Sequence, residues 1–203
     1  MALQLHNLFI IIFTLLFLST LIQSATCASN STTKSTSTTY KKFLKTQCNS
    51  TTYPNDCYKS LSPYTSKIKT DQMTLTKVSI YLALKSARSA STTLKKLSSK
   101  KLTHDETLVI ADCRENIDDT VDLLEQSSDG LVHLNGTTTS DDRFKWDTIK
   151  TWMSAAITDE GTCTDELDEM EVRSSIKKMV NTSVGKVTSL TSNALAFVNR
   201  LTY

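Results

Sequence analysis

Only two prolines and four glycines interrupt this chain of 203 residues. A sheet with many strands needs such residues at its turns, whereas long helices do without them. Between these breaks, apolar residues recur every three to four positions, which is the spacing of one helix face. The pattern predicts an all-α protein of one or at most two domains, long enough to bury a substantial core.

Four segments keep this spacing over enough residues to form long helices. We expect them over residues 71–98, 103–131, 143–161 and 174–201. The side chains expected to face the core are Leu75, Val78, Leu82, Ala90, Leu94, Leu97, Ile110, Cys113, Ile117, Val121, Leu124, Leu131, Trp146, Ile149, Met153, Ala156, Ile176, Val180, Val184, Val187, Thr191, Ala194, Phe197 and Leu201. Short polar connections make consecutive helices antiparallel neighbours, which predicts an up-and-down four-helix bundle.

Local signals mark the ends of two of these helices. Thr103 and Glu106 form a capping box, in which the threonine hydroxyl accepts from the glutamate amide and the glutamate side chain reaches back. We expect Gly161 to end the third helix. Residues 164–171 should then form an acidic connection to the last helix.

A short, turn-rich segment precedes the bundle. Pro54, Asn55 and Asp56 are a turn or helix-start signal between Cys48 and Cys57. We expect two short helices folded back as a hairpin over residues 40–70, before a bundle over 71–203. Together they form one domain over 40–203.

The N-terminus has the features of a targeting segment. Residues 8–18 are apolar except for one threonine, and small residues suited to cleavage follow at 25–28. We therefore expect residues 1–28 to be a signal peptide, with a retained membrane anchor as the alternative. Residues 29–39 are polar and of low complexity, so we expect them to be disordered.

Secretion makes oxidised cysteines the default state. Removal of Cys27 with the signal peptide leaves Cys48, Cys57, Cys113 and Cys163, which can pair in three ways. The short separation favours Cys48–Cys57, which leaves Cys113–Cys163. The chain-entropy relation then assigns about 2.7 kcal/mol to the short loop and about 4 kcal/mol to the long one.

Four Asn-x-Ser/Thr sequences follow the signal peptide and are candidates for N-glycosylation, which requires exposure. They begin at Asn30, Asn49, Asn135 and Asn181. Asn135 is the first choice, because it falls in an expected loop, whereas Asn49 adjoins a half-cystine.

The near-neutral total charge conceals a strong asymmetry. The net charge is +12 over residues 29–104, −15 over 105–171 and +5 over the rest. Such separation is typical of opposed solvated faces and can also steer a charged partner. We expect no nucleic-acid partner, because an equally acidic segment follows the basic one.

Catalytic and metal-binding patterns are missing from the sequence. The chain has no Gly-x-Ser-x-Gly elbow, phosphate loop or His-Glu-x-x-His motif. After cleavage only His104 and His133 remain, one inside the capping box and one beside a loop. The Cys48-x8-Cys57 spacing is not that of a zinc site. We expect no catalytic residue, no metal, no cofactor and no enzyme activity.

The cysteine pattern and several motifs resemble the plant invertase and pectin methylesterase inhibitor family. The matching segments are Cys48-x8-Cys57-Tyr-Lys-Ser-Leu with internal Thr-Tyr-Pro, Asp112-Cys113 with Asp118-Asp119-x-Val121, Lys150-Thr-Trp-Met-Ser-Ala-Ala156 running to Thr162-Cys163, and Thr191-Ser-Asn-Ala-Leu-Ala196. Each is weak alone, but together in this order they are specific.

The resemblance implies a four-helix bundle with an N-terminal helical hairpin and disulfides Cys48–Cys57 and Cys113–Cys163. It implies inhibition of a cell-wall carbohydrate-active enzyme by a one-to-one complex. The run 150–156 is similar to pectin methylesterase inhibitors, whereas invertase inhibitors carry Pro-Lys-Phe in a loop where this chain has Arg143-Phe144-Lys145. The expected target is pectin methylesterase, with acid invertase as the alternative.

We expect the partner contact on the acidic outer face of the second long helix (Glu115, Asp119, Asp122) and the outer face of the third (Thr148, Thr151). The −15 segment suits a basic enzyme. The other interpretation is that these acids only keep the bundle soluble.

The resemblance also implies where the protein acts. We expect a monomer secreted to the apoplast and cell wall, without membrane association after signal cleavage. The end of the chain at Tyr203 favours a free-standing inhibitor over a fusion to an esterase. A developmental or storage glycoprotein and a non-inhibitory pectin-binding glycoprotein are the remaining alternatives.

Overall fold

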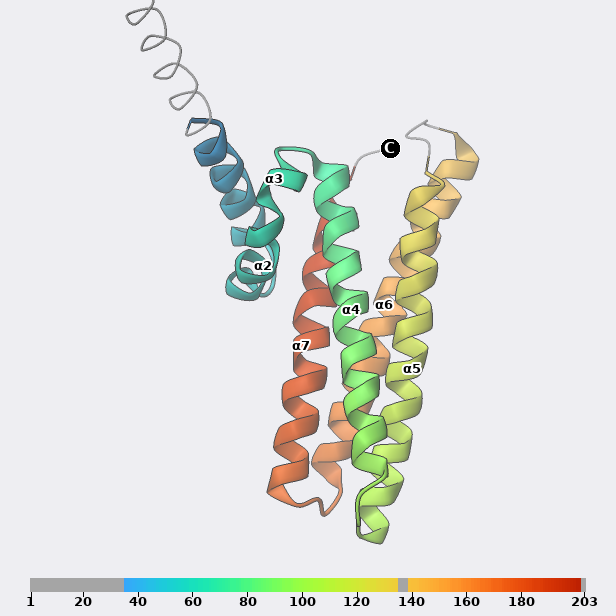
Figure 1. The fold of residues 1–203 in the computed structure, drawn as a ribbon. Coiled ribbons are helices and arrows are strands. Elements are labelled where there is room, and N and C mark those ends of the chain that lie inside the picture. The colour runs from blue at the N-terminus through green and yellow to red at the C-terminus, as the bar shows by residue number, and fades with distance from the viewer. Residues whose placement is uncertain (1–34, 135–138, 202–203) are drawn as a thin grey trace, which may run out of the picture.

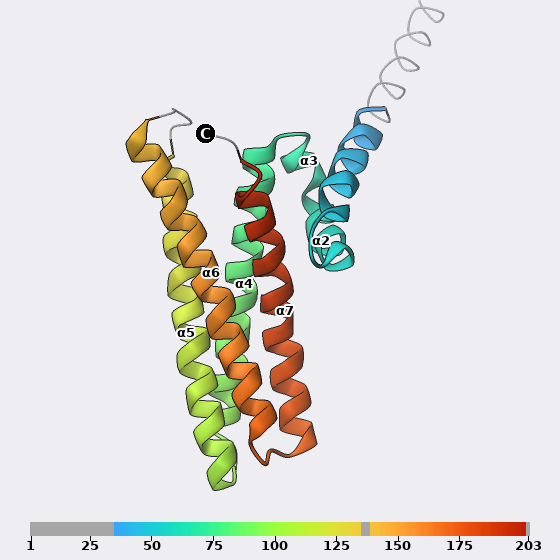
Figure 2. The same cartoon turned by 180° about the vertical axis from the view of Figure 1, so that it is seen from behind.

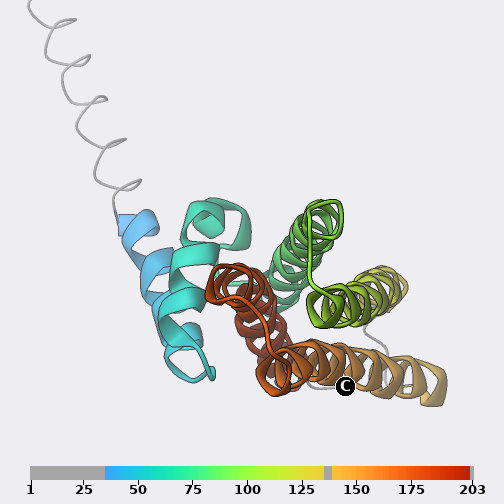
Figure 3. The same ribbon diagram turned by 90° about the horizontal axis from the view of Figure 1, so that it is seen from below.

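Four long helices form the body of the protein. The computed structural model describes residues 35–134 and 139–201. The long helices are α4 (Gln72–Ser98), α5 (His104–Val132), α6 (Ser140–Glu169) and α7 (Ser174–Val198), and they lie side by side (Figure 1). Helices α4 and α6 each pack against both α5 and α7, so the four form a closed ring, which Figure 3 shows from below. The predicted up-and-down four-helix bundle is confirmed.

The N-terminal hairpin is also present. A helix over residues 35–49 is followed by α2 (Pro54–Leu61), a short 3-10 turn η1 (Ser62–Tyr64) and α3 (Thr65–Ile68). These elements lie beside α4 and α7, on the side of the bundle away from α5 and α6 (Figures 1 and 2).

Residues 35–39, expected to be disordered, are instead an exposed part of the first helix, so the prediction was wrong for them. The helix over 40–49 is anchored by buried residues and continues without interruption into this polar stretch. The expected signal peptide and residues 29–34 lie outside the described residues. No helix in the described ranges is long and apolar enough to cross a membrane.

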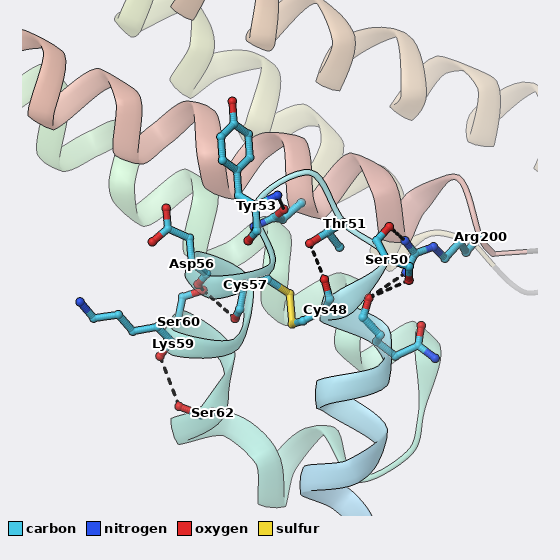
Figure 4. The surroundings of a disulfide bond; sticks show 12 residues. Cys48, Ser50, Thr51, Tyr53, Asp56, Cys57, Lys59, Ser60, Ser62 and Arg200 are labelled. Atoms are coloured by element: carbon cyan, nitrogen blue, oxygen red, sulfur yellow. Dashed lines mark hydrogen bonds between the residues drawn. A yellow bond between two sulfur atoms is a disulfide. The ribbon is translucent and has the colours of Figure 1, made fainter.

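The disulfide Cys48–Cys57 joins the two arms of the hairpin, with the Cα atoms 5.5 Å apart, as predicted. The loop between them is held by Asn193 of α7, whose side-chain amide donates to the Tyr53 carbonyl at 2.9 Å and accepts from the Tyr53 amide at 3.0 Å. Arg200 donates to the carbonyls of Gln47 and Ser50 (Figure 4). The hairpin is therefore attached to the last helix by polar contacts.

Two apolar cores follow from this arrangement. The larger one fills the four-helix ring and includes the Cys113–Cys163 pair. The smaller one lies between hairpin and bundle and consists of Leu44, Cys48, Cys57, Leu61, Ile68, Leu75, Val78 and Phe197. Phe197 was predicted to face the core of the bundle, but its side chain packs in the smaller core, against the hairpin.

Most predicted core positions are buried, with three differences. Leu82, Val121 and Leu201 are only half-buried, and Leu201 lies beyond the end of α7. Helix α4 buries a wider face than predicted, because it touches α5, α7 and the hairpin. The additional buried residues include Ile80, Ala83, Leu84 and Ala87.

Side-chain caps set the starts of three long helices. Asp71 accepts from the Thr74 amide at 2.6 Å, and Thr103 and Glu106 make the predicted capping box before α5. Thr139 caps α6 by accepting from the Asp142 amide. That cap explains why α6 begins at Ser140 rather than near 143.

The prediction that Gly161 ends the third helix was wrong. Helix α6 runs through Gly161 and Cys163 to Glu169, so most of the acidic connection expected over 164–171 is helical. A glycine inside a helix costs only about 1 kcal/mol relative to alanine. Burial of Cys163 and Leu167 on its far side exceeds that cost.

Candidate partner-binding surface

The acidic residues predicted for partner contact share one exposed face of α5. Glu115, Asp119 and Asp122 are spaced four and three residues apart, which places them on one side of the helix, and all three are exposed. Ion pairing of Arg88 with Glu125 at 2.6 Å marks the edge of α5 that faces α4. The three acids lie between that edge and α6.

The threonines predicted for contact lie on the outer side of α6. Thr151 is exposed and Thr148 is half-buried. Their hydroxyls donate to the carbonyls of Phe144 and Asp147, one turn earlier in the same helix. Their oxygens therefore face outward as acceptors. A shallow hollow of about 570 Å³ beside them is lined by Asp147, Lys150, Thr151, Ser154, Ala155 and Thr158.

Antiparallel packing of α5 on α6 brings the two faces to the same side of the bundle. The register is set by the predicted disulfide Cys113–Cys163, with Cα atoms 4.4 Å apart. The Thr120 hydroxyl, two turns along α5, lies 3.4 Å from the Ala156 carbonyl oxygen. The bridge thus confirms the second pairing and aligns the two exposed faces.

The predicted residues form an extended surface rather than a compact cluster. Asp119 lies near Asp159 of α6, and burial first and the Asp119 charge second raise the pKa of Asp159. Thr151 is eight residues from Asp159, or about 12 Å along the helix. Thr148 lies one further turn away.

Phe144 was not predicted as a contact residue, yet it lies on this surface. Its side chain is 72% exposed, more than any other large apolar side chain in the described part of the chain. It precedes Thr148 by four residues and Thr151 by seven, so the three share a face. The sequence contained one signal for this contact residue, namely an aromatic side chain on the polar side of the predicted helix. We call Glu115, Asp119, Asp122, Phe144, Thr148 and Thr151 the α5–α6 face.

The pKa values of two buried carboxyl groups on the bundle helices are shifted in opposite directions. Glu106 accepts from the Arg173 side chain at 2.6 and 2.7 Å and from the amides of Arg173 and Thr103. These bonds, those from the Arg173 side chain foremost, lower the pKa of Glu106 to about 2. Burial raises the pKa of Glu160 to about 8, although the hydrogen bond from Thr191 acts in the opposite direction.

The structure shows where the histidines and cysteines of the described ranges lie. His104 and His133 are both exposed, and all four cysteines of the described ranges are in disulfides. Within residues 35–134 and 139–201, no three His, Cys, Asp or Glu side chains are grouped to hold a metal ion.

The glycosylation candidates fall in three situations. Asn49 is exposed at the end of the first helix, and Asn181 is exposed on α7. Asn30 and Asn135 lie outside the described residues. All four stay predictions.

The fold and its two bridges define a disulfide-linked four-helix bundle with a helical hairpin, and comparison with known proteins identifies its family. Residues 42–197 match the model of the family described as plant invertase/pectin methylesterase inhibitor. The chain belongs to this family, as its motifs had indicated. It is a family of inhibitor proteins and not of enzymes.

Individual relatives agree with this assignment. Pectinesterase inhibitor 10 of Arabidopsis thaliana is 39% identical over 158 residues, covering 77% of this chain and 50% of that protein. The 21 kDa protein of Daucus carota is 36% identical over 78% of this chain and 82% of its own length. A mutant form of a pectin methylesterase inhibitor from Arabidopsis shares the fold, with a TM-score of 0.64 over 78% of this chain and 97% of its own, at 20% identity.

Proposed function

We propose that this protein is a secreted inhibitor of pectin methylesterase, which binds the enzyme one to one in the cell wall and covers its pectin-binding cleft. The observation that carries the proposal is family membership over residues 42–197, together with a relative named as a pectinesterase inhibitor. Extracellular action is supported by the apolar leader of the sequence and by two disulfides.

The α5–α6 face is the proposed contact. Its acids complement a basic enzyme and would guide the encounter. Phe144 would supply the apolar anchor, because an exposed aromatic side chain gains most when a partner covers it. The threonine oxygens would accept hydrogen bonds around that anchor.

Acid invertase is the second candidate target. Invertase inhibitors typically carry Pro-Lys-Phe in an inter-helix loop. Here Arg143, Phe144 and Lys145 lie in the first turns of α6, with no proline and in a different order. This difference, with the run 150–156, favours the esterase.

Titration of the secreted protein into a plant pectin methylesterase and a plant acid invertase, at mildly acidic pH, tests the proposal. We expect esterase activity to disappear near an equimolar ratio while invertase activity is unchanged. Size-exclusion chromatography with light scattering should then show a one-to-one complex. Loss of invertase activity alone would reverse the assignment, and no effect on either enzyme would refute it.

A further inference from the structure

A hollow on the hairpin side of α4 combines tyrosines with lysines, away from the α5–α6 face. Its volume is about 300 Å³, and its lining is Tyr64, Lys67, Thr74, Lys77, Val78 and Tyr81. We call it the tyrosine–lysine hollow. It draws on η1, α3 and α4, so it exists only because the hairpin docks beside α4.

The lining presents flat apolar surface and positive charge together. Tyr81 is 51% exposed and Tyr64 is half-buried, packed against the smaller core. Lys67 and Lys77 are exposed, and neither makes an ion pair within the described ranges. A tyrosine ring offers an apolar face and a hydroxyl, which suits the faces and edges of a sugar ring.

The charged side chains of α4 are all of one sign. Helix α4 contains no aspartate or glutamate. Lys77, Tyr81 and Lys85 follow at one-turn intervals, which spans about 12 Å. Asp71, which precedes α4, accepts from the Thr74 amide and lies within electrostatic reach of Lys77, and Glu125 of α5 pairs with Arg88.

We propose that the tyrosine–lysine hollow binds an acidic polysaccharide, namely a chain of uronic acids whose carboxylates pair with Lys77 and Lys67 while a sugar ring stacks on Tyr81. Two lysines in one hollow with two tyrosines and a threonine fit a polymer with one carboxylate and several hydroxyls per sugar. A nucleic acid, whose phosphates are spaced more densely, would fit a longer run of lysines and arginines.

The choice of a uronate polymer rests on the proposed function, because a pectin methylesterase leaves carboxylates on the pectin that it processes. Helices α4 and α6 lie diagonally across the four-helix ring (Figure 3). Enzyme contact and polysaccharide contact therefore use different sides of the molecule. The inhibitor could be retained on de-esterified wall without losing its inhibitory face.

Binding to polygalacturonate in an affinity gel tests this site, with highly methyl-esterified pectin and dextran as neutral polymers. We expect the natural chain to be retarded by polygalacturonate only. The variant Lys77→Gln/Tyr81→Ala should bind at least about tenfold more weakly. The variant Lys95→Gln/Lys96→Gln, on the last turn of α4, should bind within about twofold of the natural chain.

Circular dichroism shows whether the variants are folded, and titration against pectin methylesterase shows whether they still inhibit. Equal loss in both variants, no retardation of the natural chain, or equally tight binding of single-stranded DNA would each overturn the proposal. Retardation that depends on Lys77 and Tyr81 in a chain that inhibits no esterase would refute the proposed function and leave this site standing.

Discussion

At the scale of single residues, two buried glutamates differ in which form of the carboxyl group their surroundings favour, the ionised or the neutral one. Glu106 is surrounded by donors and stays ionised, joining the start of α5 to Arg173 before α7. Glu160 accepts the Thr191 hydroxyl at 2.8 Å on one oxygen, while its other oxygen has no hydrogen-bond partner. Such a site disfavours the charged form, so Glu160 is held neutral.

Replacing Glu160 with Gln should therefore flatten the dependence of stability on pH. The pKa of Glu160 is about 8 in the fold against an ordinary 4.5, so the unfolded chain releases its proton first as pH rises. The stability of the natural chain should fall between these values, by about 1.4 kcal/mol per pH unit at most. Urea unfolding at several pH values measures this.

The control for that experiment is Glu171→Gln, an exposed acid in the connection between α6 and α7. The free energy of unfolding of this variant should depend on pH in the same way as that of the natural chain. A Glu160→Gln variant with the same slope as the natural chain above pH 4.5 would show that Glu160 is not held neutral.

At the scale of elements, the continuity of α6 gives the long disulfide its effect. Because α6 does not stop at Gly161, Cys163 lies within a helix and faces Cys113 of α5 across the bundle. The bridge joins two helix interiors rather than a helix and a loop. It therefore sets the register of the two helices that carry the α5–α6 face.

Removing the long bridge should cost more stability than removing the short one. The loop-closure relation gives about 4 kcal/mol for Cys113→Ala/Cys163→Ala and about 2.7 kcal/mol for Cys48→Ala/Cys57→Ala. Chemical denaturation of both variants measures the difference. The long-bridge variant should also inhibit less well at temperatures where it is still folded, because the register is no longer fixed. Equal or reversed losses would contradict this ranking.

At the scale of the whole molecule, the charge blocks of the sequence become two sides of the structure. The basic block forms the hairpin and α4, and the acidic block forms α5 and α6. The two sides meet where Arg88 pairs with Glu125. The separation is suited to two partners of opposite charge, an enzyme on one side and an acidic polymer on the other.

Reversing two charges on the acidic side should slow association with the esterase. Asp119→Lys/Asp122→Lys is expected to lower the association rate by about tenfold at low salt and to flatten its salt dependence. Stopped-flow or surface-plasmon measurements over a range of salt concentrations report both. Asp165→Lys/Glu171→Lys makes the same change in net charge near the far end of α6 and should have a smaller effect. Unchanged kinetics in the first variant would remove the α5–α6 face from the proposed contact.

Much of this architecture is local and was predictable from the sequence. The four long helices were indicated by features that act within a few residues: the apolar spacing, the scarcity of glycine and proline, and the Thr103–Glu106 capping box. The Cys48–Cys57 pair was indicated by the short separation of the two cysteines. The same local reasoning failed at Gly161, where burial of Cys163 and Leu167 outweighs a stop signal.

Only the tertiary structure decided which polar residues act together. Helical spacing continues the predicted core stripe of the third helix from Ala156 to Glu160, but only the packing of α7 against α6 shows that this carboxyl group is enclosed and bonded to Thr191. Likewise, η1 and α3 must dock beside α4 before Tyr64 and Tyr81 can line the same hollow. These outcomes depend on contacts between residues far apart in the chain, which no local pattern encodes.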